Sequence, residues 1–113
     1  MEVKLVTPKY TYELIQGGGD IELIDVRTPA EYADFHASGA VLLPLNLLDP
    51  IAFVAERESA TKKPVYILCK TSVRASHACE MLLAAGAKDV FVVEGGTIAW
   101  AESGLPIEFS DQE

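Results

Sequence analysis

The sequence predicts an α/β protein with a parallel sheet covered by helices, and two features carry that prediction. Short apolar runs alternate with longer segments whose apolar residues recur at helical spacing, as expected where parallel strands are joined by helices. Several of the longer segments also begin with a capping residue followed by proline, which favours the first turn of a helix. At 113 residues, the chain is expected to form one domain spanning residues 1–113 without disulfide staples.

Four apolar runs are the predicted strands, and a shorter run near the start of the chain is a candidate edge strand. The four runs are residues 21–26, 41–43, 64–68 and 90–93, and the edge candidate is residues 3–6. Because these runs alternate with longer, helix-like segments, the predicted sheet is parallel and has helices packed against it.

Three helix starts can be predicted from their caps alone, because a capping side chain stands directly before a proline at the first helical position. These starts are Thr7-Pro8, Thr28-Pro29 and Asp49-Pro50. Thr28 and Glu31 also have the capping-box spacing, in which each side chain bonds the backbone N–H of the other residue. The first of these helices is expected to end at residues 17–19, which are all glycine.

A further helix is predicted from Arg74 to Gly86. Its apolar residues fall at positions i, i+3, i+4 and i+7 and form one face for the sheet; they are Ala75, Ala78, Cys79 and Leu82. This stripe favours core packing for Cys79 over a role as a resolving thiol. Cys79 lies almost three helical turns beyond Cys69, roughly 15 Å along the axis at ~1.5 Å per residue, so both are predicted to be free thiols.

The composition argues against several classes of function. A formal net charge of −8 disfavours binding to nucleic acids, which depends on clustered Lys and Arg. No apolar run approaches the ~20 residues that span a bilayer, and the N-terminus lacks the layout of a signal peptide. The chain is therefore expected to be cytoplasmic, without membrane or nucleic-acid partners. Its two histidines and two cysteines lack the close pairing of a zinc site, so no metal is predicted.

The most informative segment runs from a predicted buried strand into Cys69, four spacer residues and Arg74. In open α/β sheets ligands bind beyond the carboxyl ends of the strands, and Cys69 lies at such an end. Cysteine reacts as the thiolate, which backbone N–H groups, a helix N-terminus or a cation can stabilise. Residues 70–74 could supply all three, since they lead into a helix and include the cations Lys70 and Arg74.

The hydroxyls of Thr71 and Ser72 would add further donors around the sulfur. A thiolate held in this way could attack a sulfur-bearing anion, keep the outer sulfur as a persulfide and pass it to a nucleophilic acceptor. The alternative interpretation makes Cys69 a small buried hydrophobe at a strand end. The context of strand, loop, arginine and helix favours the reactive thiolate. His36 and Trp100 are interpreted as structural residues, and the Gly95-Gly96 pair as a turn.

Several separated motifs resemble those of the rhodanese family of sulfurtransferases over nearly the whole chain. Residues 23–32 (LIDVRTPAEY) resemble the first signature of the family, residues 36–44 its continuation, and residues 69–74 (CKTSVR) the active-site loop. Residues 86–93, 94–100 and 104–106 resemble the closing signature. The joint match is far more specific than any single motif.

The resemblance implies a three-layer fold whose central five-stranded parallel sheet has helices on both faces. It implies a thiosulfate sulfurtransferase without a cofactor, in which Cys69 carries the persulfide and Arg74 closes the loop around it. Asp25 and Arg27 match residues that support the loop. The implied partners are a small sulfur-containing anion as donor and cyanide, a thiol or a protein as acceptor. The implied substrate-binding residues are Lys70, Thr71, Ser72 and Val73.

Two positions depart from the family pattern. The family loop often carries glycine where this chain has Ser72, and glycine is favoured where a tight loop needs positive φ. Ser72 is therefore expected either to strain the loop or to place it in a different conformation. Phe35 stands where glycine is frequent, directly before His36.

Three alternative functions accompany this prediction. Phosphatases and arsenate reductases of similar fold have five residues between cysteine and arginine, and the four-residue spacer here suits a sulfur atom better than a phosphoryl group. A sulfur carrier restricted to one protein partner and a non-catalytic interaction module are the other two. The presence of Cys69 argues against the non-catalytic module, while the sequence does not distinguish a general sulfurtransferase from a restricted carrier.

Overall fold

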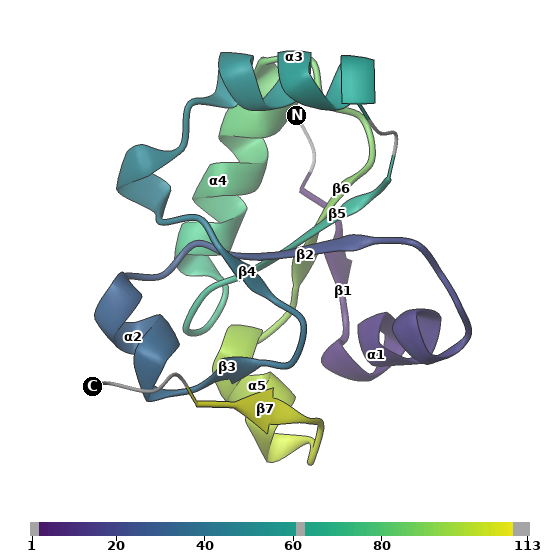
Figure 1. Ribbon diagram of the computed structural model, residues 1–113, viewed down its shortest axis with the longest axis vertical. Coiled ribbons are helices and arrows are strands. Elements are labelled where there is room, and N and C mark those ends of the chain that lie inside the picture. The colour runs from purple at the N-terminus through teal and green to yellow at the C-terminus, as the bar shows by residue number, and fades with distance from the viewer. Residues whose placement is uncertain (1–2, 61–62, 110–113) are drawn as a thin grey trace.

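Five parallel strands form the central sheet of the computed structural model, which describes residues 3–60 and 63–109. The order across the sheet is β1-β6-β5-β2-β4, and every neighbouring pair is parallel (Figure 1). The predicted five-stranded parallel sheet, with the run near the N-terminus at its edge, is confirmed. Its strands are β1 (Leu5–Val6), β2 (Glu22–Asp25), β4 (Val41–Leu42), β5 (Val65–Leu68) and β6 (Val90–Val93).

The helices that follow Thr7, Thr28 and Asp49 begin where the capping signals predict. The side chain of Thr7 accepts a hydrogen bond from the Tyr10 backbone at 3.0 Å, and Asp49 accepts one from Ala52 at 3.1 Å. Thr28 forms the capping box in both directions. Within the described residues, the helices are α1 (Pro8–Gln16), α2 (Pro29–Asp34), α3 (Pro50–Ala60), α4 (Val73–Ala84) and α5 (Gly96–Glu102).

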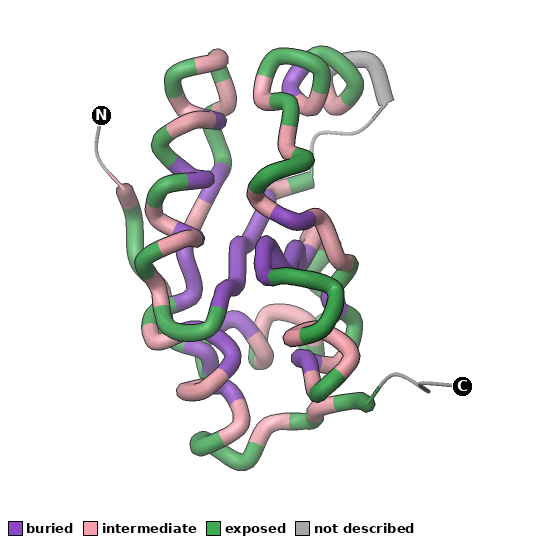
Figure 2. The backbone as a smooth tube through the Cα atoms, turned by 90° about the vertical axis from the view of Figure 1, so that its left-hand side faces the viewer, coloured by how far each residue is buried: buried purple, intermediate pink, exposed green. Residues whose placement is uncertain are grey.

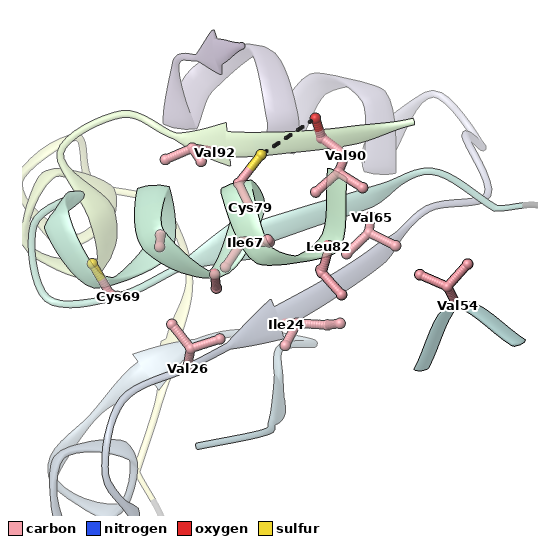
Figure 3. Close-up of a cluster of buried hydrophobic side chains, with 12 residues drawn as sticks. Ile24, Val26, Val54, Val65, Ile67, Cys69, Cys79, Leu82, Val90 and Val92 are labelled. Carbon is pink, nitrogen blue, oxygen red and sulfur yellow. Dashed lines mark hydrogen bonds between the residues drawn. The ribbon is translucent and has the colours of Figure 1, made fainter. Parts of the chain in front are cut away.

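Helices cover both faces of the sheet. On one face α3 and α4 enclose a core cluster that includes Ile67, Val92 and Leu82 (Figure 3). On the other face α1, α2 and α5 pack over a second cluster that includes Tyr66 and Trp100. Buried residues accordingly concentrate in the central strands and on the inward sides of the helices (Figure 2). The predicted three layers are confirmed.

Three details of the fold were not predicted. A second, antiparallel sheet pairs β3 (His36–Ala37) with β7 (Ile107–Glu108). A 3₁₀ turn, η1 (Leu45–Leu47), precedes α3. Helix α4 begins at Val73, one residue before the predicted start, and its N-cap residue Ser72 makes no side-chain capping bond. The β3 and β7 pairing joins segments about 70 positions apart, so no local pattern could reveal it.

The strand order places β5 in the middle of the sheet, between β2 and β6. In this register Asp25 at the end of β2 lies opposite Leu68 at the end of β5. The backbone N–H of Val26 then donates to the Leu68 carbonyl at 2.9 Å, which extends the ladder by one step. The residue that follows, Cys69, is therefore held at the carboxyl edge of the sheet, where ligands bind in folds of this kind.

Candidate active site around Cys69

Cys69 leaves the central strand with its side chain on the α4 side of the sheet. Side chains alternate along a strand, and Val65, Ile67 and Cys69 all belong to the core cluster beneath α4, whereas Tyr66 and Leu68 belong to the opposite one. Only 1% of Cys69 is exposed. The sulfur thus lies at the boundary between the core and the carboxyl edge of the sheet (Figure 3).

The loop after Cys69 presents backbone N–H groups that have no acceptor. Within the described part of the chain, residues 70–75 donate no backbone hydrogen bond, and the first closing bond of α4 runs from Ser76 to Ser72 at 2.9 Å. Unpaired N–H groups before and within the first turn of a helix attract anions. This run of donors begins at the residue after Cys69, as an anion-stabilising loop would require.

Ser72 adopts a backbone conformation that any residue can adopt. Its φ is −160°, and no residue other than glycine in the described ranges has a positive φ. A serine in place of glycine therefore does not have to adopt a positive φ at this position. Lys70 and Thr71 are exposed, and 77% of Val73 is accessible, so these predicted substrate-binding residues line the outer surface of the loop.

The first residues of α5 form hydrogen bonds with the loop that follows Cys69. The backbone N–H of Thr97 donates to the Cys69 carbonyl at 2.8 Å, and that of Ile98 to the Lys70 carbonyl at 3.2 Å. Gly96 has a φ of +62°, and a Cβ atom there would collide with the carbonyl oxygens of Cys69 and Thr71. Glycine is therefore required at position 96 both by the conformation and by the close approach of two backbones.

Arg74 forms an ion pair with Glu31 at the start of α2. Its two terminal nitrogens donate to the two carboxylate oxygens of Glu31 at 2.8 and 2.9 Å. This bond raises the pKa of Arg74, and the negative charges of Glu31, Cys69 and Asp25 act in the same direction. Arg74 therefore lies within electrostatic range of the sulfur, but both of its terminal nitrogens are already engaged.

Asp25 and Arg27 form a buried pair beside the end of β5. Arg27 donates to both oxygens of Asp25, at 2.8 to 3.1 Å, and to the Phe35 carbonyl at 2.6 Å. The Asp25 side chain is fully buried, and the backbone N–H of Arg27 also bonds it. A buried pair is tolerated only when its remaining hydrogen bonds are satisfied, as here. The pair joins the end of β2 to the segment that follows α2.

A family model for the rhodanese-like domain matches residues 7–103 of the chain. The chain belongs to this family. Two curated relatives agree with the assignment: a sulfurtransferase of Allochromatium vinosum is 40% identical over 78% of this chain and 78% of its own. The thiosulfate sulfurtransferase GlpE of Haemophilus influenzae is 29% identical over 96% of this chain and 97% of its own length.

Another relative is longer than this chain. An uncharacterized protein of Synechocystis, slr1261, is 35% identical over 89% of this rhodanese-like chain, which spans only 54% of that protein. Solved structures share the fold: the rhodanese-like domain of Alr3790 from Anabaena has a TM-score of 0.78 at 26% identity, covering 96% of this chain and 80% of that one. A Rhodopseudomonas palustris protein described as a possible tyrosine phosphatase has a TM-score of 0.80 at 26% identity, over 94% of this chain and 85% of its own.

The other singled-out residues of this rhodanese-like chain have structural surroundings. The ring of His36 stacks on Tyr32 with centroids 3.7 Å apart, and its Nδ1 lies 2.8 Å from the Tyr32 carbonyl oxygen. Trp100 is fully buried and donates to the Pro106 carbonyl at 2.7 Å. Cys79 lies in the core, where burial raises its pKa. The predicted core position of Cys79 and the structural hydrogen bond of His36 are confirmed.

Two residues of the site were missed in the sequence. Glu31 was noted only as a helix cap, because its partner Arg74 stands 43 positions away. Gly96 was assigned to a turn, although the adjacent glycines at positions 95 and 96 were a signal that two backbones come close. Neither pattern indicated the partner residue. The contacts of Glu31 with Arg74 and of Gly96 with the Cys69 loop form only when the chain has folded.

A cavity of about 180 Å³ lies away from this site, at the amino ends of β5 and β6. Arg57, which lines it, is paired with Glu22 and donates to the Lys63 carbonyl. The cavity is lined by neither cysteine, so we do not assign the sulfur chemistry to it.

In residues 3–60 and 63–109 there is no cluster of three potential metal ligands. No helix in the same ranges has the length and apolar character needed to cross a membrane.

Proposed function

We propose that the protein is a sulfurtransferase in which Cys69 carries sulfane sulfur as a persulfide. The observation that carries the proposal is the position of Cys69 at the carboxyl end of the central strand, followed directly by backbone donors that have no acceptor among the described residues. Anionic sulfur species are the ligands that such donors stabilise. The similarity to GlpE, which is named a thiosulfate sulfurtransferase, supports thiosulfate as one donor.

The reaction has two half-reactions that need no cofactor. In the first, the Cys69 thiolate attacks the outer sulfur of thiosulfate; a new S–S bond forms, the old one breaks, and sulfite leaves with its bonding electrons. In the second, cyanide or an acceptor thiolate attacks the outer sulfur of the persulfide, and Cys69 leaves as the thiolate. In both steps the free N–H groups after Cys69 would stabilise negative charge on sulfur. Lys70, which is exposed, would attract the anionic donor.

Mass spectrometry tests the proposal directly. Wild-type protein incubated with thiosulfate is expected to gain one sulfur atom, and cyanide is expected to remove it as thiocyanate. Cys69→Ser should gain none. The matched control is Cys79→Ala, because that thiol is buried in the core and should not affect sulfur uptake. A wild-type protein that gains no sulfur from thiosulfate or from a small-molecule persulfide would refute the proposal.

The same assay separates the alternatives. Sulfur uptake from a protein persulfide, with none from thiosulfate or a small-molecule persulfide, would indicate the partner-restricted carrier. Turnover of p-nitrophenyl phosphate without sulfur uptake would indicate a phosphatase, the activity suggested in the description of the R. palustris neighbour. Absence of both activities would favour the interaction module.

A further inference from the structure

Arg74 lies within electrostatic range of Cys69, and it is already bound to an anion. Both of its terminal nitrogens donate to Glu31, in the two-point geometry that makes arginine and carboxylate pairs strong. The pair is only partly exposed, with 34% of the Arg74 side chain and 29% of the Glu31 side chain accessible. A donor that approaches Arg74 therefore meets a guanidinium that keeps free N–H groups but whose charge Glu31 already offsets.

The Glu31 carboxylate is also fixed by hydrogen bonds at the start of α2, so it is not free to leave Arg74. Its Oε1 accepts hydrogen bonds from the backbone N–H of Thr28 at 3.0 Å and from the Thr28 hydroxyl at 3.2 Å. These bonds belong to the capping box that begins α2, so releasing the carboxylate would also weaken the start of the helix. The hydrogen bond from Arg74 contributes most to lowering the pKa of Glu31 to about 2, and the carboxylate stays ionised near neutral pH.

The net positive charge of the site before a donor binds is therefore smaller than the presence of Lys70 and Arg74 suggests. Arg74 and Glu31 cancel, which leaves Lys70 and the backbone N–H groups. Lys70 is exposed and makes no ion pair within the described residues. A small dianion such as thiosulfate depends on cationic partners, whereas the transferable sulfur of a persulfide on a larger molecule carries at most one charge.

We propose that Glu31 sets the donor specificity of the site by occupying Arg74, which weakens the binding of small dianions and favours persulfide donors. This inference rests on the proposed sulfurtransferase function. With a persulfide R–S–SH, the Cys69 thiolate attacks the outer sulfur, an S–S bond to Cys69 forms, the R–S bond to that sulfur breaks, and R–S⁻ leaves with the electron pair. No oxidant or reductant is required.

Steady-state kinetics of Glu31→Gln test the role of Glu31. Glutamine can keep the hydrogen bonds to Thr28, because it also serves in capping boxes, but it removes the charge that holds Arg74. The KM for thiosulfate is expected to fall about two- to fivefold, the size of one partly exposed ion pair, with kcat little changed. The KM for glutathione persulfide should stay the same. A structural defect alone would not lower a KM.

The matched control is Glu80→Gln, which removes one exposed carboxylate from α4 and changes the net charge equally. If Glu80→Gln lowers the KM for thiosulfate as much as Glu31→Gln does, the effect is one of overall charge and the specific role of Glu31 is refuted. An unchanged or higher KM for thiosulfate in Glu31→Gln would refute it as well.

A binding measurement separates this inference from the proposed function. Sulfate, an unreactive dianion, is titrated while the backbone amide resonances of residues 70–75 are followed by NMR. Glu31→Gln is expected to bind sulfate about two- to fivefold more tightly than wild type. Equal affinities, or no binding to either protein, would overturn the inference. Tighter sulfate binding by the variant in a protein that never accepts sulfur would retain the role of Glu31 and reject sulfur transfer.

Discussion

Gly96 shows how much of the site depends on a single residue without a side chain. It lets the start of α5 meet the Cys69 loop closely enough for Thr97 and Ile98 to bond the carbonyls of Cys69 and Lys70. Those two bonds hold the carbonyl groups of the loop toward α5. These carbonyls accept hydrogen bonds from α5, while the backbone N–H groups of residues 70–75 have no acceptor in the described part of the chain. The N–H groups therefore remain available for a ligand.

Gly96→Ala is therefore expected to damage both stability and sulfur uptake. A left-handed alanine costs about 1–2 kcal/mol, and the collision with the Cys69 and Thr71 carbonyls adds about 1–3 kcal/mol of overpacking. The control is Gly104→Ala, where φ is +77° but a Cβ atom meets nothing within 4 Å. Urea denaturation and the thiosulfate mass assay measure both effects. Equal losses in the two variants would contradict a specific role for the close contact.

At the scale of elements, α2 owes its first turn to a residue that also bonds α4. Glu31 completes the capping box with Thr28 and pairs with Arg74 in the first turn of α4. One carboxylate thus links the starts of two helices that approach the carboxyl edge of the sheet. Its lowered pKa measures how strongly the folded state prefers the ionised form.

This link predicts a defined pH dependence of stability. The pKa of Glu31 is lowered from 4.5 to about 2, so its contribution is present above pH 4.5 and is lost as pH falls toward 2. The difference in unfolding free energy between wild type and Glu31→Gln should be constant from pH 5 to 7 and shrink below pH 4.5. Urea denaturation across this range measures it. A difference that stays constant down to pH 2.5 would show that the folded pKa is not lowered.

At the scale of the whole molecule, the core beneath α4 joins the chemistry to the stability of the fold. Cys69 and Cys79 belong to the same cluster, at its edge and in its interior, and the Cys79 sulfur lies 3.9 Å from the Val90 carbonyl oxygen (Figure 3). Both thiols are almost inaccessible in the folded chain. Opening this cluster would separate α4 from the sheet, and the loop after Cys69 would keep only its bonds to the start of α5.

The reactivity of Cys79 is expected to report this opening. In the Cys69→Ser protein, alkylation of Cys79 should be at least about a thousandfold slower in native buffer than in concentrated urea, because it requires an opening that costs about 5 kcal/mol or more. Burial also raises the pKa of Cys79, which lowers the thiolate fraction. Iodoacetamide labelling followed by mass spectrometry gives the rates. Rapid labelling in native buffer would mean that this core opens locally.

Local chemistry was sufficient for most of the elements and for the position of the candidate nucleophile. Thr7, Thr28 and Asp49 act on N–H groups within three residues of themselves, so their helices could be predicted where they begin. Apolar runs predicted the strands, and Cys69 at the end of one of them marked the candidate site. These signals act over one helical turn or one strand, which a sequence displays directly.

The tertiary structure alone decided what surrounds that nucleophile. The strand order brings Glu31 to Arg74 and Gly96 to the Cys69 loop, and the second sheet pairs His36 with Glu108. It also determined that Ser72 has a negative φ and that Arg74 is paired with a carboxylate. Such contacts join residues separated by tens of positions, and they form only when packing of the whole chain has selected one arrangement of the strands. The sequence by itself therefore determined which residue is the candidate nucleophile, whereas the folded chain decided which charged groups surround that residue.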